Sequence, residues 1–192
     1  GIMITASHNP PQDNGFKTIE PKGEMLPQSW EKYVTSIANS VKKNQFDAFL
    51  ENFLQVASEA LKNVEIHDRK LKIIVGRDTR ESSYRLASFC KQFFGSIVNT
   101  SQISGNFIDY GVVTTPQLHF IVRKHTLEQQ SEQFDLLKEY FNAFFQPFID
   151  ILDKSNHLKF RKLYIDCANG VGAVQLNQLK EIFKSKTDKI KI

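Results

Sequence analysis

The sequence of 192 residues predicts an α/β fold, and three observations support that prediction. The composition is 41% hydrophobic and 24% charged, which is typical of a globular chain that can bury a core. Short apolar runs of strand type alternate with segments whose apolar residues recur at helical spacing. The stretch from Leu71 to Phe93 joins a strand, a charged turn and a helix, which is the repeating unit of a wound sheet.

Two strands are predicted at the start of the chain, at residues 1–5 and 16–19. The simplest geometry places them side by side with a polar loop at one end. In that geometry Lys17, on the second strand, lies close enough to face Ser7 in the loop. The loop contains two strong turn signals, Asn9-Pro10-Pro11 and Asp13-Asn14-Gly15.

Two helices follow, the first opened by Pro27 and Ser29 and the second starting near Asp47. The aromatic residues of the second helix are expected to pack in a core and not to form a cofactor site, and the apolar residues of both helices recur at helical spacing. These residues are Trp30, Val34, Ile37, Ala38, Val41, Phe49, Leu50, Phe53, Leu54, Ala57, Ala60 and Leu61.

A buried strand is predicted at residues 71–75, followed by a helix with Ser82 or Ser83 as its N-cap. Gly95 is expected to stop this helix. Residues 97–98 are a candidate for the next strand.

Residues 107–113 are a further strand candidate, and Thr115 and Pro116 fit the N-cap and first position of another helix, through Lys124. One long helix is predicted from residue 128 to 152, and Pro147 is expected to kink or split it.

A second domain is expected to begin near residue 158. Residues 163–166 are predicted to form its first strand, which leads through a turn into a helix. The predicted organisation is therefore a domain at 1–125, a helical connection at 126–157 and the start of a second domain at 158–192.

Composition argues against several classes of partner. The net charge is +4, from 25 basic and 21 acidic residues, and the lysines near the carboxyl end alternate with apolar residues, so we expect no nucleic-acid partner. No apolar run is long enough to span a membrane, and we expect no membrane partner. Cys90 and Cys167 lie far apart, which favours reduced, packed thiols in a cytoplasmic protein.

The loop after the first strand holds the strongest chemical signal. Ser7 offers a hydroxyl nucleophile, which needs a base, a positive field or a metal to react. His8 is adjacent in sequence and Lys17 is expected nearby in space. A Ser-His-Asp hydrolase is a weak alternative because Ser7 lacks the flanking glycines of a nucleophile elbow. A turn without chemistry is the other interpretation of these residues.

Other polar clusters are weaker candidates. The Gly170-Val171-Gly172 stretch lacks the third glycine of a dinucleotide loop, since Gln175 occupies that position, so we interpret it as a tight turn. Residues 77–80 could clamp a phosphate through their arginines or form a salt-bridge cluster that stabilises a turn. The remaining histidines show no metal-ligand spacing and are interpreted as structural or solvated: His67, His119, His125 and His157.

Residues 5–10, with Asp13-Asn14-Gly15 and Lys17, resemble the active-site serine loop of the α-D-phosphohexomutase superfamily. Within it, the chain is similar to the eukaryotic phosphoacetylglucosamine mutases. Four further stretches carry this narrower resemblance: residues 23–26 with 29–31, 76–80, 109–111 with 114–119, and 166–173.

The resemblance implies a three-layer α/β/α domain with a mixed sheet, followed by the first β-α unit of a second, similar domain. The chain would then be a fragment that covers most of domain 1 and the start of domain 2. The order of strands in the sheet is part of what the resemblance implies.

The resemblance also implies interconversion of N-acetylglucosamine 6-phosphate and 1-phosphate, toward UDP-N-acetylglucosamine. Ser7 would carry a phosphate, pass it to the sugar to give a bisphosphate, and take the other phosphate back. His8 and Lys17 would act as proton-transfer or electrostatic groups, with their roles left open. A Mg²⁺ ion would bind the phosphate on Ser7.

Several parts of the family pattern do not occur in this sequence. They are the Asp-rich metal loop, the sugar loop, the last phosphate-binding loop and the segment before the serine loop with its phosphate-contacting arginine. The remaining Mg²⁺ ligands are therefore expected in missing domains of the same polypeptide, and the chain alone is expected to be inert. Two alternatives stay open: a phosphohexomutase for glucose or mannose phosphates, and a non-catalytic truncated homologue that binds phosphosugar or a partner.

Overall fold

The computed structural model describes residues 1–6, 8–10, 12–42, 46–62, 70–98, 104–128, 135, 137–154 and 164–186. The chain divides into two compact units. The sheet unit comprises Gly1–Glu24 and Leu71–Ile192, and the helical unit comprises Met25–Lys70. Every residue of the candidate site described below belongs to the sheet unit.

The sheet has four strands among the described residues, in the order β2-β1-β3-β4. β1 pairs in parallel with β3, and β3 pairs in parallel with β4, whereas β2 is antiparallel to β1. The predicted mixed α/β sheet is therefore confirmed. The carboxyl ends of the three parallel strands meet at one edge, which places the loops that follow them side by side. The strands are β1 Ile2–Ile4, β2 Phe16–Thr18, β3 Leu71–Arg77 and β4 Gly105–Val112.

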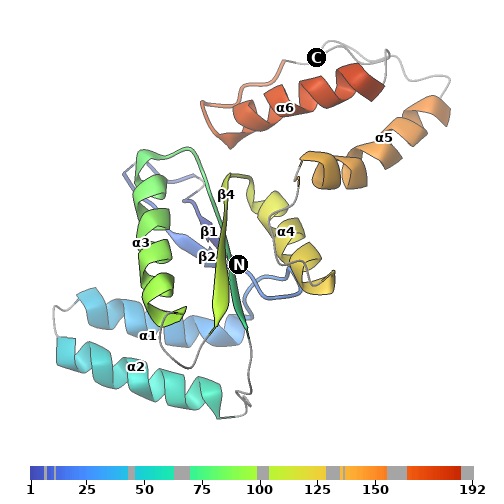
Figure 1. Ribbon diagram of the computed structural model, residues 1–192. Helices are drawn as coiled ribbons and strands as arrows, with labels where there is room; N and C mark the ends of the chain where they lie inside the picture. Colours follow the sequence, from blue (N-terminus) through green and yellow to red (C-terminus); the bar gives the residue numbers. More distant parts are fainter. Residues whose placement is uncertain are drawn as a thin grey trace. The chain divides into compact units, whose positions relative to one another are not determined.

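Helices cover both faces of the sheet, with α3 (Glu81–Val98) on one side and α4 (Thr115–Leu127) on the other (Figure 1). Two separate apolar clusters follow from this three-layer arrangement. The α3 face buries Ile4, Ile73, Val75 and Ala87, with Leu86, Cys90 and Phe94 packed against them. The α4 face buries Met3, Ile19, Ile74, Ile108, Tyr110, Val113, Leu118, Ile121 and Val122.

The carboxyl-terminal part of the sheet unit contributes a single π-helical turn, Leu137–Phe141, then α5 (Asn142–Lys154) and α6 (Val171–Lys186). The rings of Phe145 on α5 and Phe183 on α6 meet edge to face, with centroids 5.1 Å apart. Lys124, at the end of α4, contacts Glu128 at 2.7 Å and Glu139 at 3.1 Å. Hydrogen bonds to these two carboxylates, that to Glu128 first, raise the pKa of Lys124. No helix within the described ranges is long and apolar enough to cross a membrane.

The helical unit contains a 3₁₀ turn, Gln28–Trp30, then α1 (Glu31–Lys42) and α2 (Phe46–Leu61). Polar side chains join the two helices. The Asn52 amide on α2 donates to the hydroxyls of Ser36 at 2.9 Å and Ser40 at 2.7 Å on α1. Tyr33 donates to Glu59 at 2.6 Å.

The prediction that the aromatic residues of α2 pack in a core is wrong for Phe53, and other apolar residues of this unit are exposed as well. Phe53 is 45% exposed and Leu54 is 58% exposed. The two helices contact each other through hydroxyls and an amide, so part of each apolar stripe faces outward. A pair of helices is too thin to enclose the apolar stripes of both. Other exposed members are Trp30, Val34, Val41 and Leu50.

The sequence-based boundaries of α3 are also wrong. The helix begins at Glu81, ahead of both serines proposed as its N-cap, and it runs through Gly95 to Val98. Residues 97–98 are therefore helical and not a strand. A glycine costs a helix interior only about 1 kcal/mol, which the buried stripe of an 18-residue helix outweighs.

Three smaller differences concern helix and strand ends. The N-cap of α4 is Thr114, one residue earlier than predicted, and it forms a capping box with Gln117. Pro147 lies inside α5, which continues through it, while part of the predicted 128–152 helix lies outside the described residues. Residues 164–166 form no strand, since no neighbouring strand pairs with them in the described part of the chain.

The packing of the sheet predicts opposite effects for two glycine substitutions. A Cβ on Gly76 in β3 would meet the side chain of Val113 and lie 3.2 Å and 3.3 Å from two methyl groups of Leu118. Gly76→Ala should therefore lower the free energy of unfolding by about 1–3 kcal/mol through overpacking. A Cβ on Gly95 meets nothing within 4 Å, so Gly95→Ala should raise that free energy by about 0.5–1 kcal/mol. Urea unfolding of both variants measures the difference, and equal midpoints would contradict this packing.

Candidate active site

The polar residues of the candidate site gather at the carboxyl edge of the sheet. β1 ends at Ile4 and β3 at Arg77, and these two residues are partners in the parallel register. The first residue beyond β3 is linked to the end of β1, because the backbone N–H of Asp78 donates to the Ile4 carbonyl at 3.0 Å. The loop that leaves β1 therefore starts beside the turn that leaves β3.

The carboxylate of Asp78 connects these loops to α3. One oxygen, Oδ2, accepts the hydroxyl of Thr5 at 3.0 Å. The other, Oδ1, accepts the backbone N–H of Arg80 at 3.0 Å and the hydroxyl of Ser83. The Asp78 side chain is only 12% exposed, so these donors replace the water that its charge would otherwise bind.

Asn14 fixes the returning half of the serine loop, which we define as residues 5–15. Its amide nitrogen donates to the hydroxyl of Ser82 at 2.9 Å and to that of Ser83 at 2.8 Å. Its amide oxygen accepts the backbone N–H of Gly15 at 2.8 Å. The loop is closed at its base by the Thr5 N–H, which donates to the Gly15 carbonyl at 3.0 Å. Both ends of the loop are thus held against the start of α3.

The three residues predicted to carry the chemistry are placed only in part. Ser7 lies outside the described residues, and its neighbour His8 is exposed. Lys17 lies on β2 opposite Met3 in the antiparallel register, with an exposed side chain. The strand pair with the loop at one end is confirmed, whereas an approach of Lys17 to Ser7 stays a prediction.

The two arginines of residues 77–80 have different surroundings. Arg77 binds both carboxylate oxygens of Asp109 on β4, at 2.7 Å and 2.8 Å, and its guanidinium lies 5.5 Å from the ring centroid of Tyr84. These contacts favour the salt-bridge interpretation for Arg77. Arg80 reaches the serine loop, where its Nη2 donates to the Asn9 carbonyl at 2.9 Å.

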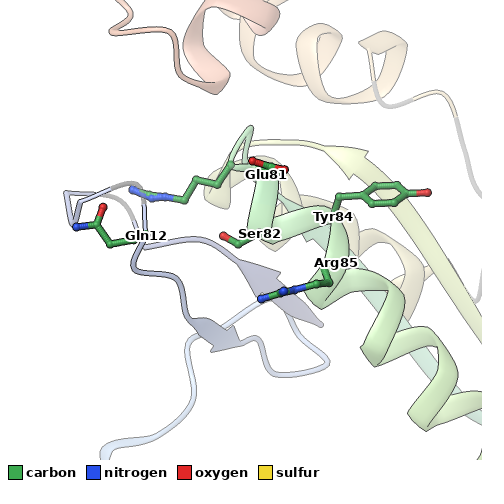
Figure 2. A pocket seen from close by; sticks show the side chains of 6 residues that line it. Gln12, Glu81, Ser82, Tyr84 and Arg85 are labelled. Carbon is green, nitrogen blue, oxygen red and sulfur yellow. The ribbon is translucent and has the colours of Figure 1, made fainter.

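Arg80 lines two cavities. One of about 480 Å³ lies between the carboxyl edge of the sheet and the turn before α6, lined by Thr5, Asn9, Asp78, Thr79, Arg80 and residues 167–171. The other, of about 710 Å³, is lined by Gln12, Arg80, Glu81, Ser82, Tyr84 and Arg85. Figure 2 shows that Gln12 lies across this second opening from the start of α3.

The far wall of the smaller cavity is a tight turn. The N–H of Gly170 donates to the Cys167 carbonyl at 2.8 Å, and Ala168 and Asn169 adopt φ values of 45° and 57°. Thr79 donates from its hydroxyl to the Asn169 carbonyl at 3.5 Å, across the cavity. A tight turn ahead of a helix is present here, but it spans residues 167–170, and Val171 and Gly172, which were expected in the turn, already belong to α6.

The described residues contain no group of three or more His, Cys, Asp or Glu side chains that could hold a metal ion. The carboxylate of Asp78, which contacts the serine loop through Thr5, is also engaged by Arg80 and Ser83. Cys90 and Cys167 are free thiols. The described side chains therefore do not form a Mg²⁺ cage.

The histidines outside the serine loop have structural contacts where they are described. The Nδ1 of His119 lies 2.8 Å from the Gly23 carbonyl, and the Nε2 of His125 lies 2.7 Å from the hydroxyl of buried Tyr110. Their structural interpretation is supported by these contacts. His67 and His157 lie outside the described residues.

Sequence reasoning missed the residues that hold the site together. Asn14 was interpreted only as a turn residue and Gln175 only as a replaced glycine. Gln175 is in fact 9% exposed and is hydrogen-bonded to Gln117. A signal for it was present, because Gln175 falls on the same helical face as Leu179, Ile182 and Phe183. An amide within an apolar stripe indicates a buried partner.

Comparisons with known proteins identify the family. The family model described as "Phosphoglucomutase/phosphomannomutase, alpha/beta/alpha domain I" matches residues 1–48 and 39–130. The chain therefore belongs to this family. It is 38% identical over 189 residues to phosphoacetylglucosamine mutase 1 of Schizosaccharomyces pombe, covering 96% of this chain and 33% of that protein. It is 32% identical over 186 residues to the human phosphoacetylglucosamine mutase, covering 95% of this chain and 32% of that protein.

Solved structures agree with this assignment. A crystal structure of N-acetylglucosamine-phosphate mutase in its product complex aligns with a TM-score of 0.73 and 31% identity, over 96% of this chain and 32% of that one. The Aspergillus fumigatus enzyme in complex with GlcNAc-6P and magnesium aligns with a TM-score of 0.69 and 33% identity, over 100% of this chain and 33% of that one. The chain thus spans about a third of the length of the relatives it matches.

The contacts of Asp78 predict a strong dependence of stability on its charge. Asp78→Asn keeps the shape of the side chain but replaces one acceptor oxygen with an amide nitrogen, so the donors at that position, among them one of the two bonds from Arg80, lose their acceptor. We expect a loss of about 2 kcal/mol in the free energy of unfolding, as for a buried hydrogen bond to a charged group.

The matched control is Asp150→Asn on α5, where an exposed carboxylate accepts one bond from Gln146 at 2.9 Å. This variant should change stability by less than about 0.5 kcal/mol. Chemical unfolding measures both, and an Asp78→Asn variant as stable as its control would show that the carboxylate does not hold these loops.

Proposed function

We propose that this chain is the first domain, with the start of the second, of a phosphosugar mutase that interconverts N-acetylglucosamine 6-phosphate and 1-phosphate. The observation that supports this most strongly is the serine loop. It is held at the carboxyl edge of the sheet by Asp78, Asn14 and Arg80, beside a cavity of about 480 Å³. Relatives at 32–38% identity are phosphoacetylglucosamine mutases. A cytoplasmic role in the synthesis of UDP-N-acetylglucosamine belongs to this proposal.

In the proposed reaction Ser7 carries a phosphoryl group to and from the sugar. The bond between phosphorus and the Ser7 oxygen breaks as a bond forms to the free hydroxyl of the monophosphate sugar. The hydroxyl loses its proton, and a bisphosphate results. The bisphosphate then reorients in the site. Its other phosphoryl group is transferred to Ser7, which leaves the second monophosphate. A solved Ser-to-Ala variant of the Aspergillus fumigatus relative in complex with glucose 1,6-bisphosphate supports a bisphosphate in such a site.

A proton must leave the attacking hydroxyl and return to the departing oxygen in each half of this cycle. His8 and Lys17 are the proposed groups for these transfers, on the loop and on β2 respectively. Either could instead act by its charge, because phosphoryl transfer depends mainly on positioning and on electrostatic stabilisation.

Arg80 is proposed to bind a phosphate in the cavity that it lines. Its side chain is 15% exposed, and two contacts orient it: the Asn9 carbonyl at 2.9 Å and the Asp78 carboxylate at 3.4 Å. A guanidinium held in this way presents fixed donors to phosphate oxygens without reorganisation.

Mg²⁺ belongs to the proposal through Ser7, whose phosphate would be one ligand. A bound Mg²⁺ would neutralise phosphate charge. The A. fumigatus neighbour in complex with GlcNAc-6P and magnesium supports such an ion in the family. The remaining ligands, and further contacts to the phosphosugar, are proposed to come from other domains of the same polypeptide, since the chain covers about a third of its relatives.

The first test is Ser7→Ala in the longest natural polypeptide that carries this chain. Without the hydroxyl no phosphate can be carried, so mutase activity on N-acetylglucosamine 6-phosphate should fall about a thousandfold or more. Intact mass of the variant should also lack the single phosphate that we expect on the parent protein. Ser96→Ala on the exposed side of α3 is the matched control and should retain both. Full activity in Ser7→Ala would overturn the phosphoserine mechanism.

A second test concerns the chain of 192 residues by itself. We expect no turnover of N-acetylglucosamine 6-phosphate by this chain, because its described residues do not form the Mg²⁺ cage. Measured turnover would refute this expectation. In the longer polypeptide, comparing N-acetylglucosamine, glucose and mannose phosphates separates the proposed substrate from the alternative sugars. No activity with any of them would favour the non-catalytic alternative.

A further inference from the structure

The smaller cavity has two walls that come from distant parts of the chain. Its near wall is the carboxyl edge of the sheet, with Thr5, Asn9 and residues 78–80, and its far wall is the turn at residues 167–171. The hydrogen bond that joins them directly, from Thr79 to the Asn169 carbonyl, is exposed and 3.5 Å long. A contact of that length contributes little, so the spacing of the walls needs another support.

We propose that Gln117 on α4 and Gln175 on α6 form a buried amide clamp that positions the far wall of this cavity. The Gln117 nitrogen Nε2 donates to the Gln175 oxygen Oε1 at 2.6 Å. Gln117 is 1% exposed and Gln175 is 9% exposed. Gln175 lies one helical turn beyond Val171, which lines the cavity, so the clamp acts at the end of α6 that carries the turn.

The orientation of the clamp is set from the side of α4. The Gln117 oxygen accepts the backbone N–H of Thr114 at 2.7 Å and its hydroxyl at 3.1 Å, as part of the helix cap. With that oxygen committed, the Gln117 nitrogen must face away from the cap, toward α6. The Gln175 nitrogen then donates to the Val112 carbonyl at the end of β4, at 3.4 Å. The clamp therefore connects α6 both to the α4 cap and to the last residue of a sheet strand.

The turn moves together with α6 because backbone hydrogen bonds join the two. Ala173 donates from its N–H to the Gly170 carbonyl at 3.1 Å, and Gly170 donates to the Cys167 carbonyl at 2.8 Å. The Ala168 N–H donates to the Asp166 carboxylate at 2.8 Å. A displacement of α6 would carry these residues with it and change the width of the cavity.

Apolar packing alone would leave the position of α6, and of the turn that precedes it, less well defined. The contact of Phe145 with Phe183 holds the distal part of α6, where edge-to-face rings tolerate small shifts. A buried amide pair does not, because a shift leaves donors and acceptors without partners in a low-dielectric interior. Gln117 and Gln175 are thus positioning residues: they act on the cavity through residues 167–171. The role of the cavity in phosphosugar binding rests on the proposed function, whereas the clamp itself does not.

Hydrogen exchange of the protein, followed by mass spectrometry, tests the clamp. Gln175→Met removes both of its hydrogen bonds at similar volume. Amides of residues 166–173 should then exchange about fivefold faster or more, the factor expected for one net hydrogen bond. Asn177→Met, which replaces an exposed amide on the same helix, is the matched control and should leave exchange unchanged. Unchanged exchange in Gln175→Met, or an increase spread equally over β3 and α3, would overturn the proposal.

A double variant provides a second measurement. Gln117→Met should speed exchange in the turn and also at the first turn of α4, where its oxygen completes the cap. If the two amides act as one clamp, the double variant exchanges in the turn no faster than Gln175→Met. Effects that multiply would mean that the residues act separately and would overturn the clamp. Exchange does not depend on activity, so this outcome and the outcome for Ser7→Ala are independent.

Discussion

The arrangement of the candidate site depends on one carboxylate, that of Asp78. It accepts donors from the end of β1 through Thr5, from its own turn through Arg80 and from α3 through Ser83. A carboxylate has about four lone-pair positions, and here each oxygen receives at least two of these donors. The start of the serine loop and the start of α3 therefore cannot move independently. The bonds to Asp78 also fix the position of Arg80.

The parallel sheet makes this contact possible. Ile4 and Arg77 are partners in the register of β1 and β3, so both strands end at the same level. A backbone hydrogen bond from Asp78 to the Ile4 carbonyl then joins the first residue after β3 to the end of β1. Thr5 and Asp78 supply a hydroxyl donor and a carboxylate acceptor at the first positions beyond the strands. Strand order thus brings the loops together, and side-chain chemistry fixes the distance between them.

Patterns that are local in sequence predicted much of this fold. Apolar runs predicted β1, β3 and β4, and the turn signals around the serine loop predicted the β1–β2 pair. Features that depend on partners far away were not predictable. Gly95 reads as a helix stop, but the packing of α3 on the sheet carries the helix past it. Asp78 and Gln175 read as a charged turn and a missing glycine, because their partners Thr5 and Gln117 lie 73 and 58 residues away.

The near wall of the cavity is held by a charged contact between Asp78 and Arg80, whereas the far wall is held by the neutral clamp. This difference is chemically reasonable for an anionic ligand. Asp78 carries a negative charge, but Arg80 contacts it at 3.4 Å and compensates that charge. The clamp at the far wall contains no such cation, and a carboxylate in place of Gln175 would add an uncompensated negative charge one helical turn from Val171, which lines the cavity. In a low-dielectric interior that charge would repel a phosphate. A neutral amide pair gives α6 the same directional hold without this repulsion, so it is compatible with the proposed phosphate site, whereas a single carboxylate without a cation would not be.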